Sequence, residues 1–296
     1  MPKQIYFSLE ELNRGNFFEL HEVLAADEGQ HYELEEWLGR GGNAAVYRCR
    51  NSVTGDEYAV KFLMHTGDRN QKRFAREADL LKQFQNEHIV RYTGSGTANV
   101  RHILRRQRGA SRVAQGLPFL VMELAKCNLQ DVMKQERVPI PYERYSGQFR
   151  GLSRALAALH DIAIHRDIKP ENILVSGERW MLSDYGLCSF VSPVDEEDLT
   201  PEGQNVGPKY WLSPEAHNMR LGCADQITKA SDVFQLAAVF WYVATGRHPS
   251  GIVTQSDWSG PSGLFDLLQR SLLHDLKKRP KDGAEFVAEL DAALIS

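Results

Sequence analysis

Apolar residues recur at intervals of three and four in several long stretches, the spacing that places them on one face of a helix. One stretch runs from about residue 69 to 85 and a second from about 142 to 162. A third begins near Ser231 and is apolar nearly all round through Val243, which is typical of a helix buried inside a domain. The residues of the first two stripes are Phe74, Ala78, Leu81 and Phe84, and Tyr145, Phe149, Leu152, Leu156 and Leu159. A further helix is predicted at about 284–294.

Runs typical of strands lie earlier in the chain. Residues 32–38 lead into a glycine-rich turn, residues 57–63 are rich in strand-forming residues, and residues 118–125 read as a buried strand that runs into a linker.

Residues 1–30 are predicted to form a short helical extension. Ser8 with Glu11 three residues later makes a capping-box pattern, and Asn16 with Glu19 repeats it. We expect this segment to pack on the following domain rather than to form a module of its own.

Composition excludes several classes of protein. The chain has 296 residues, 42% of them hydrophobic and 25% charged, with a net charge of −4, so nothing global points to nucleic acid or to an anionic membrane. The four cysteines are scattered without metal or redox spacing, which favours reduced thiols. There is no apolar signal core at the N-terminus, and the most apolar run, residues 233–244, is too short to span a bilayer. These features predict a cytoplasmic protein.

The most unusual stretch is His165–Asn172, which reads His-Arg-Asp-Ile-Lys-Pro-Glu-Asn. Apolar residues bracket it at 162–164 and 173–175, and its proline disfavours a helix. The stretch is therefore predicted to be a polar loop held between two buried strands, which is a good way to fix charged groups in place.

Two further charged residues interrupt apolar elements. Lys61 lies inside the strand-like run at 57–63, and Glu77 lies on the apolar face of the first predicted helix. A carboxylate on such a face is costly unless it is paired, so Lys61 is its expected partner. The simpler alternatives are that Lys61 extends outward from an edge strand and that Glu77 pairs with a neighbouring Lys or Arg.

Together these motifs resemble those of protein kinases of the serine/threonine type. The resemblance covers about residues 30–296 and rests on the loop at 165–172, on Asp184-Tyr185-Gly186, on Ser213-Pro214-Glu215 and on the glycine-rich turn. It implies an α+β, two-lobed fold with a β-rich N-lobe (31–122), a hinge (123–127) and a larger helical C-lobe (128–296). It also implies Mg-ATP as the phosphoryl donor and serine or threonine hydroxyls of proteins, including the chain's own, as acceptors.

The resemblance assigns roles to single residues. Asp167 orients the acceptor hydroxyl, Lys169 neutralises the transferring phosphoryl group, and Lys61, paired with Glu77, holds the nucleotide's phosphates. Asn172 and Asp184 are the expected Mg²⁺ ligands. The expected nucleotide-binding residues are Leu38, Gly39, Arg40, Gly41, Gly42, Asn43, Ala44, Val46, Ala59, Lys61, Met122, Glu123, Ala125 and Leu174.

Six residues are expected to have structural or regulatory roles. Arg166 would receive an anion from the activation segment, and His165 would pack against Tyr185. Glu215 would pair with Arg279. Asp232 would both cap its helix and anchor the loop that carries Asp167.

The activation segment, residues 184–215, holds the candidate phosphorylation sites Ser189, Ser192 and Thr200. Its acidic run at 195–198 could instead supply the anion for Arg166, or be plain solvated charge. The basic run at 101–112, predicted as a solvated loop, could alternatively bind an acidic or phosphorylated partner.

Several positions depart from the family pattern. Ala44 replaces the third glycine, which should reduce flexibility at the tip of the turn, and Tyr185 replaces phenylalanine. Pro208 stands where active kinases carry a threonine that contacts the catalytic Asp and Lys, and Trp211 replaces a tyrosine. These departures keep a nucleotide-binding pseudokinase or scaffold open as the alternative function, and phosphorylation of a small molecule as a third.

Overall fold

The computed structural model describes residues 2–104, 111–136, 138–191 and 210–295. The chain divides into two compact units. The first comprises residues 1–84 and 91–124, and the second comprises residues 85–90 and 125–296.

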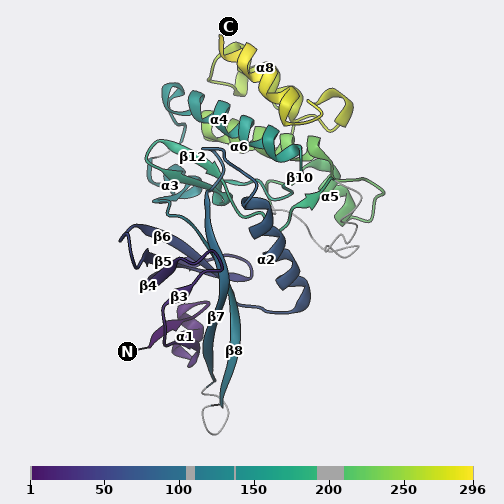
Figure 1. Cartoon of the computed structure of the whole chain (residues 1–296). Helices are drawn as coiled ribbons and strands as arrows, with labels where there is room; N and C mark the ends of the chain where they lie inside the picture. The colour runs from purple at the N-terminus through teal and green to yellow at the C-terminus, as the bar shows by residue number, and fades with distance from the viewer. Residues whose placement is uncertain (1, 105–110, 137, 192–209, 296) are drawn as a thin grey trace. The chain divides into compact units, whose positions relative to one another are not determined.

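The first unit is built on an antiparallel eight-stranded sheet with the strand order β1-β2-β7-β8-β6-β5-β4-β3 (Figure 1). Its helices are α1 (Leu9–Asn13) and α2 (Asp68–Leu81). The strands are β1 (Lys3–Ile5), β2 (Asn16–Leu20), β3 (Leu24–Ala25), β4 (His31–Arg40), β5 (Ala44–Asn51), β6 (Glu57–Leu63), β7 (Tyr92–Leu104) and β8 (Ser111–Glu123).

The prediction of a helical N-terminal extension is wrong for most of residues 1–30. Only the first capping pattern starts a helix, α1, where the Ser8 hydroxyl accepts a hydrogen bond from the Glu11 amide at 3.3 Å. The second pattern lies in strand β2, which pairs with β7. Pairing along β7 and burial of Phe17, Phe18 and Leu20 outweigh the local capping signal.

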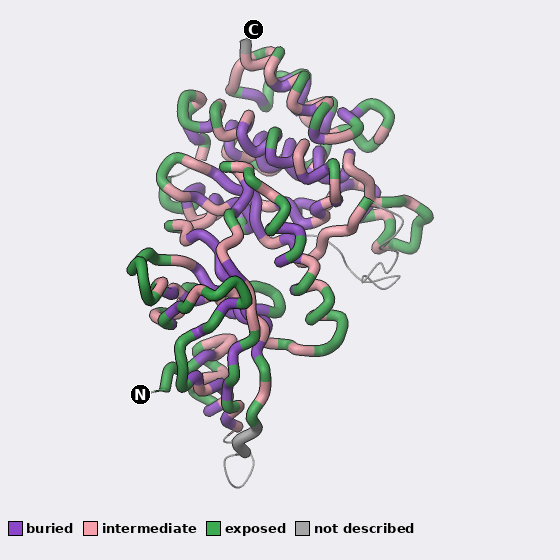
Figure 2. Tube along the Cα trace, in the orientation of Figure 1, coloured by how far each residue is buried: buried purple, intermediate pink, exposed green. Residues whose placement is uncertain are grey.

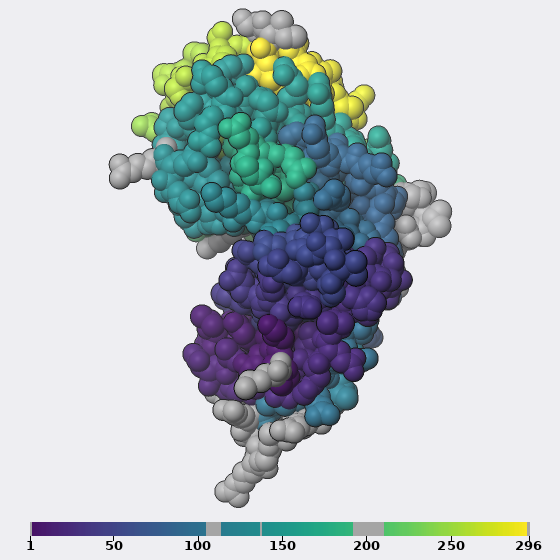
Figure 3. All heavy atoms as spheres, turned by 60° about the vertical axis from the view of Figure 1, so that its left-hand side comes forward, coloured from purple at the N-terminus to yellow at the C-terminus, as the bar shows by residue number. Residues whose placement is uncertain are grey.

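These N-terminal strands complete the core of the first unit. Ile5, Phe18, Leu20 and Leu24 share one buried cluster with residues of the strands from β4 to β8. A further contact joins the chain after β1 to strand β5. The Tyr47 hydroxyl on β5 donates to the carbonyl of Tyr6 at 3.0 Å and accepts from its amide at 2.7 Å. Figure 3 shows atoms of the N-terminal segment, in the darkest purple, on the surface of this unit.

The expectation of a solvated loop at the basic run 101–112 is wrong for residues 101–104 and 111–112, which lie in strands β7 and β8. Strands β7 and β8 form a continuous hairpin whose register runs to Leu104 opposite Ser111. Arg101 and His102 lie on β7, whereas residues 105–110 lie outside the described residues. Ala98, Val100 and Ile103 are buried, which is the packing that holds this stretch as a strand.

The second unit is mainly helical (Figure 2). Its helices are α3 (Leu129–Glu136), α4 (Tyr142–His160), α5 (Pro214–Arg220), α6 (Lys229–Thr245), α7 (Ser262–Ser271) and α8 (Gly283–Ile295). Short 3₁₀ turns lie at η1 (Pro170–Asn172), η3 (Gln255–Asp257) and η4 (Leu276–Lys278). The strands are β9 (Cys127–Asn128), β10 (Ala163–Ile164), β11 (Ile173–Ser176), β12 (Arg179–Leu182) and β13 (Ser189–Phe190).

Helices α4, α6 and α8 pack tightly around one core. The rings of Phe149 on α4 and Phe240 on α6 stack with centroids 3.7 Å apart. Gly283 begins α8 directly against α4, where a Cβ would lie 2.5 Å from the amide nitrogen of Ala157, so a larger residue would push the helices apart. The predicted helices are therefore present, although α6 begins two residues earlier than Ser231. Among the described residues, no helix combines the length and apolar character needed to cross a membrane.

Candidate active site

The polar loop at 165–172 runs between strands β10 and β11, and its backbone is held by buried side chains. The Asp232 carboxylate accepts from the amides of His165 at 2.6 Å and Arg166 at 2.8 Å, and it lies 3.1 Å from His160 Nε2. The expected anchoring contact of Asp232 is thus present. Its expected capping role is wrong, because the helix is capped by Thr228 in a capping box with Ser231.

Arg166 adopts the left-handed backbone conformation, with φ of 69°. Such a conformation is uncommon for a residue other than glycine and persists only where the surroundings determine it. Here the Asp232 carboxylate holds its amide.

Asp167 projects a buried carboxylate that two side chains contact. Lys169 Nζ donates to Asp167 Oδ2 at 2.9 Å, and Asn172 Nδ2 donates to the same oxygen at 2.8 Å. Burial raises the pKa of Asp167; the neighbouring Lys169 ammonium opposes this shift, and the charge of Asp184 adds to it. A carboxylate with a raised pKa is better able to accept a proton from a hydroxyl than an ordinary aspartate.

Asp184 is brought beside this loop by the end of strand β12. The amide and the hydroxyl of Ser183 both donate to the carbonyl of Asn172 at 2.9 Å. Asp184 itself has φ of 61°, so its backbone is held in the left-handed region. Asn172 and Asp184, which are twelve positions apart in the sequence, are thereby brought close together.

Tyr185 keeps the aromatic packing expected at its position and satisfies its added hydroxyl. The hydroxyl donates to the carbonyl of Leu182 at 3.0 Å, and the ring lies 5.0 Å from that of buried His165. The departure from phenylalanine therefore leaves no unpaired hydroxyl in the core.

Asn172 and Asp184 fit a magnesium ion by their donor chemistry. Among the described residues, the hydrogen bonds of the Asn172 side chain use its nitrogen, which leaves the carboxamide oxygen for a cation. Mg²⁺ takes few protein ligands and prefers carboxylate and amide oxygens. Among the described residues there is no cluster of three or more His, Cys, Asp or Glu that would hold a transition metal.

In the first unit, Lys61 on β6 and Glu77 on α2 form an ion pair. Lys61 Nζ donates to Glu77 Oε1 at 2.8 Å and to Oε2 at 2.9 Å. The Glu77 side chain is 3% exposed and that of Lys61 is 12% exposed, so water screens the pair little. The pairing expected from the sequence is present, and the alternative of an outward-facing edge lysine is wrong.

The glycine-rich turn joins β4 to β5. Gly39 pairs with Val46, and the Gly41 amide donates to the carbonyl of Ala44 at 2.8 Å. Ala44 is buried as the first residue of β5, opposite Leu63, rather than at the tip of the turn. The expectation that Ala44 stiffens the tip is therefore wrong, and the turn itself consists of Gly41, Gly42 and Asn43.

The residues expected around the adenine divide between the two units. Ala59 pairs with Met122 across β6 and β8, and both are buried. The Glu123 amide donates to the carbonyl of Arg91 at 3.0 Å, and its carboxylate accepts from the amide of Arg91 at 2.8 Å. Leu38 lies on β4, whereas Ala125 and Leu174 belong to the second unit, where Leu174 pairs with Asn128.

Glu215 and Arg279 form the expected buried pair. The guanidinium donates from Nη1 to Oε1 at 2.9 Å and from Nη2 to Oε2 at 3.0 Å. Burial raises the pKa of Glu215, but the hydrogen bonds and charge of Arg279 outweigh it and hold the pKa below the ordinary value. The bidentate geometry fixes the start of α5 to the chain before α8.

The activation segment is described only at its ends. Ser189 lies on β13, opposite Ile164. The candidate sites Ser192 and Thr200, the acidic run at 195–198 and Pro208 lie outside the described residues.

Beyond this segment, Trp211 is buried against Tyr242 and His248, with ring centroids 5.7 and 4.8 Å away. A cavity of about 750 Å³ opens beside Trp211. Its other described lining residues include Gln130, Glu171, Tyr210, His217 and Tyr242.

Sequence reasoning missed two buried residues that support the loop. His160 Nδ1 accepts from the amide of Gly283 at 2.9 Å while Nε2 lies against Asp232. Gln235 accepts from the amide of Ile168 at 3.0 Å. The sequence did offer a signal for Gln235. Its carboxamide lies in a helix that is apolar on nearly all sides, and such a group is costly to bury without hydrogen-bond partners.

Comparison with known proteins matches the chain to protein kinases. The family model described as "Protein kinase domain" matches residues 32–286. Curated relatives include "Serine/threonine-protein kinase pkn2" of Myxococcus xanthus, 28% identical over 284 residues, covering 86% of this chain and 31% of the relative. "Serine/threonine-protein kinase PknH" of Mycobacterium tuberculosis is 28% identical over 280 residues, covering 88% of this chain and 41% of the relative. The chain thus spans less than half the length of these relatives.

The match confirms the predicted family and the predicted α+β fold class.

Proposed function

The chain belongs to the protein kinase family, and from this premise we propose that it transfers the γ-phosphoryl group of Mg-ATP to serine or threonine hydroxyls of proteins. The observation that carries the proposal is the arrangement around Asp167, whose buried carboxylate meets Lys169 and Asn172. Relatives named as serine/threonine-protein kinases support the acceptor class.

Asp167 acts on the acceptor. Its buried carboxylate, with a raised pKa, accepts a hydrogen bond from the attacking hydroxyl and orients the oxygen toward phosphorus. Lys169 lies beside it and offsets the negative charge of the phosphoryl group during transfer.

The donor is held by the remaining residues. Lys61, fixed by Glu77, contacts the α- and β-phosphates, and the glycine-rich turn offers backbone amides to them. Asn172 and Asp184 hold Mg²⁺, which when bound neutralises phosphate charge and orients the phosphates. We assign the adenine edge to backbone groups of Glu123 and Ala125, beside Ala59, Met122 and Leu174.

We assign the cavity beside Trp211 to the segment of the acceptor protein that flanks the hydroxyl. It lies in the unit that carries Asp167, and Glu171 of the catalytic loop lines it. Trp211, which stands where the family pattern has a tyrosine, lines this cavity and is itself buried.

Two further predictions belong to the proposal. A cytoplasmic location is supported by four cysteines that are all free thiols. Phosphorylation among Ser189, Ser192 and Thr200 would supply an anion for Arg166, and an acidic or phosphorylated partner would suit the basic hairpin end near Arg101.

The scaffold alternative is weakened by the complete set of transfer residues, which a protein that only binds ATP does not need. Of the departures from the pattern, Ala44 and Tyr185 are accommodated locally.

The test is incubation of the full chain with radiolabelled ATP and Mg²⁺, using dephosphorylated casein as acceptor. Asp167→Asn should lower kcat by about 10²–10⁴-fold, because the variant side chain cannot accept the hydroxyl proton. Asp184→Ala should abolish Mg²⁺-dependent transfer.

Asp161→Asn is the matched control, because Asp161 is an exposed aspartate at the end of α4. Transfer by the wild type no greater than by Asp167→Asn would refute the kinase proposal, and ATP-dependent thermal stabilisation without transfer would favour a scaffold.

A further inference from the structure

Gln235 buries a carboxamide inside helix α6, at a position that the family roles above do not use. Its side chain is 2% exposed, and most of its neighbours along the helix are apolar. It follows Asp232 by three residues, which places both side chains on the same face of the helix. Burying a carboxamide is costly unless its oxygen accepts and its nitrogen donates a hydrogen bond.

Both groups find partners in the catalytic loop. Gln235 Oε1 accepts from the amide of Ile168 at 3.0 Å, and Nε2 donates to the carbonyl of Arg166 at 3.5 Å. These two backbone groups belong to the two peptide planes on either side of Asp167. One side chain therefore bridges both planes, and only a group with an acceptor and a donor can do so.

The remaining groups of these planes are held by other residues. The carbonyl of Asp167 accepts from Asn172 Nδ2 at 2.9 Å, so the plane after Asp167 is fixed at its N–H by Gln235 and at its C=O by Asn172. The amide of Asp167 donates to His165 Nδ1 at 3.3 Å. Without Gln235, both planes would lose one of their two partners, and rotation about the Cα of Asp167 would meet less resistance.

We propose that Gln235 is a positioning residue for phosphoryl transfer, whose carboxamide holds the peptide planes flanking Asp167 and so aims the carboxylate at the acceptor hydroxyl. The inference rests on the proposed kinase function and extends it to a residue that touches neither substrate. A misplacement of a reacting group by about 1 Å can cost about 10²-fold in rate, so a contact of this kind matters to kcat.

The first test is Gln235→Met, which keeps the side chain's length and removes both hydrogen bonds. With radiolabelled ATP and dephosphorylated casein, kcat should fall at least about tenfold while KM for ATP stays within about twofold. Val239→Ala, one turn further along the same buried face, is the control: it should lower the melting temperature and leave kcat unchanged. Equal kcat values for Gln235→Met and the wild type would overturn the inference.

The second test is Gln235→Glu, because a protonated carboxyl group both accepts and donates, as the carboxamide does, whereas a carboxylate only accepts. The charged or titratable groups around this hydrogen-bond network are Asp232 on the same helix, His160 on α4, and Arg166 and Asp167 in the loop. Burial and the two aspartates favour the protonated form.

The ratio of kcat for Gln235→Glu to that of the wild type should therefore rise as pH falls from about 8 to about 6, while the ratio for Gln235→Met stays constant. A purely structural role predicts no such difference between the variants. A kcat ratio for Gln235→Glu that is as low as that for Gln235→Met, and equally independent of pH, would contradict the proposed bridge.

Amide hydrogen exchange supplies a readout that needs no activity. Peptides covering residues 165–169 should exchange at least about tenfold faster in Gln235→Met than in the wild type or in Val239→Ala. Unchanged exchange would overturn the positioning role even if the wild type proved inactive. Absence of wild-type transfer together with faster exchange would refute the kinase function alone.

Discussion

Two buried carboxylates, Glu77 and Glu215, are each paired with a cation. Glu77 meets Lys61 in the first unit, and Glu215 meets Arg279 in the second. Removing one partner of a buried pair leaves an uncompensated charge, which typically costs about 3–5 kcal/mol. The two pairs have different roles. The pair with Glu77 holds Lys61, a proposed phosphate ligand, whereas the pair between Glu215 and Arg279 joins two segments of the fold.

Glu77→Gln is expected to raise KM for ATP and to lower kcat/KM by on the order of 10²-fold, since Lys61 loses the partner that fixes its ammonium group. Steady-state kinetics at varied ATP concentration measures the effect. Glu57→Gln is the control, because Glu57 lies on the same strand as Lys61 and pairs with partly buried Arg48 and exposed Arg50. An unchanged KM in Glu77→Gln would contradict the assigned role of Lys61.

Arg279→Met is expected to destabilise the second unit by about 3–5 kcal/mol at pH 7, because Glu215 is left charged and buried. The pKa of Glu215 is held below its ordinary value of 4.5. The stabilisation from the pair is therefore complete above that value and is lost as pH falls through the lowered pKa. The difference between variant and wild type should shrink below about pH 4.5.

Urea unfolding at a series of pH values measures this difference. Arg270→Met removes a comparable ion pair, between Arg270 and Glu289, that is partly exposed, and should cost about 1 kcal/mol or less. Equal losses in the two variants at pH 7 would show that burial does not strengthen the pair with Glu215.

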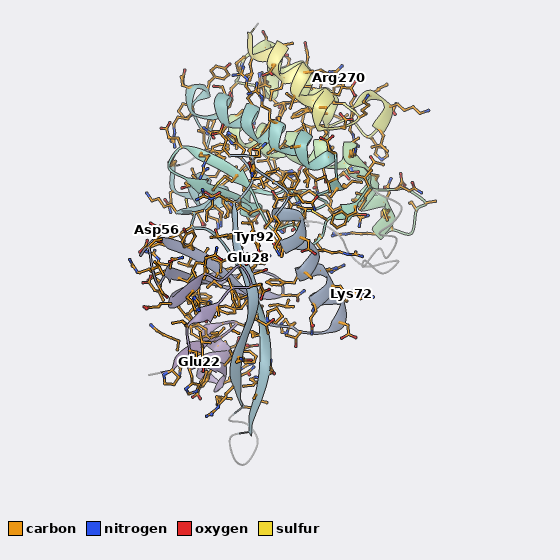
Figure 4. All side chains as sticks on the ribbon, in the orientation of Figure 1. Glu22, Glu28, Asp56, Lys72, Tyr92 and Arg270 are labelled. Carbon is orange, nitrogen blue, oxygen red and sulfur yellow. The ribbon has the colours of Figure 1, made fainter. Side chains whose placement is uncertain are left out.

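Among the elements, the strands of the N-terminal segment differ most from expectation. Strand β2 lies against β7 and buries Phe18, whose ring stacks on His102 at 4.4 Å. Beyond β3, the Ser95 amide donates to Glu28 at 3.1 Å, and Glu28 also accepts from the Tyr92 hydroxyl, as Figure 4 shows for the labelled Glu28 and Tyr92. Lys82, just after α2, lies 3.6 Å from the same carboxylate. The segment therefore braces the helix that carries Glu77.

Phe18→Ala is expected to lower the free energy of unfolding of the first unit by about 3–5 kcal/mol, because it leaves a cavity between β2 and the rest of the sheet. The urea midpoint of the full chain measures the loss. Val23→Ala, at a half-exposed position in the same segment, should change stability by less than about 0.5 kcal/mol. A loss for Phe18→Ala as small as for Val23→Ala would mean that β2 is not part of the core.

Over the whole molecule, elements with local periodicity were the most predictable. Helices α2 and α4 begin and end within a few residues of the positions expected from their apolar stripes, because a helix forms its hydrogen bonds within one segment. The pair Lys61–Glu77 could be anticipated because a carboxylate on an apolar face needs a partner. The pair Glu215–Arg279 was expected from the resemblance to protein kinases.

Contacts between distant segments were less predictable. The N-terminal strands were predicted as helix and the basic run at 101–112 as loop, because strand pairing depends on a partner elsewhere in the chain. Ala44 was placed at the tip of the turn for the same reason, since only its pairing with Leu63 shows that it belongs to β5.

The polar loop at 165–172 depends on both the local sequence and the tertiary structure. Its residues resemble the catalytic loop of protein kinases, and that resemblance indicated phosphoryl-transfer chemistry. Only the tertiary structure placed Gln235 and His160 behind it. Local sequence specifies which groups are available, whereas hydrogen bonds across nearly 70 residues, formed when the helices pack, decide how those groups are held.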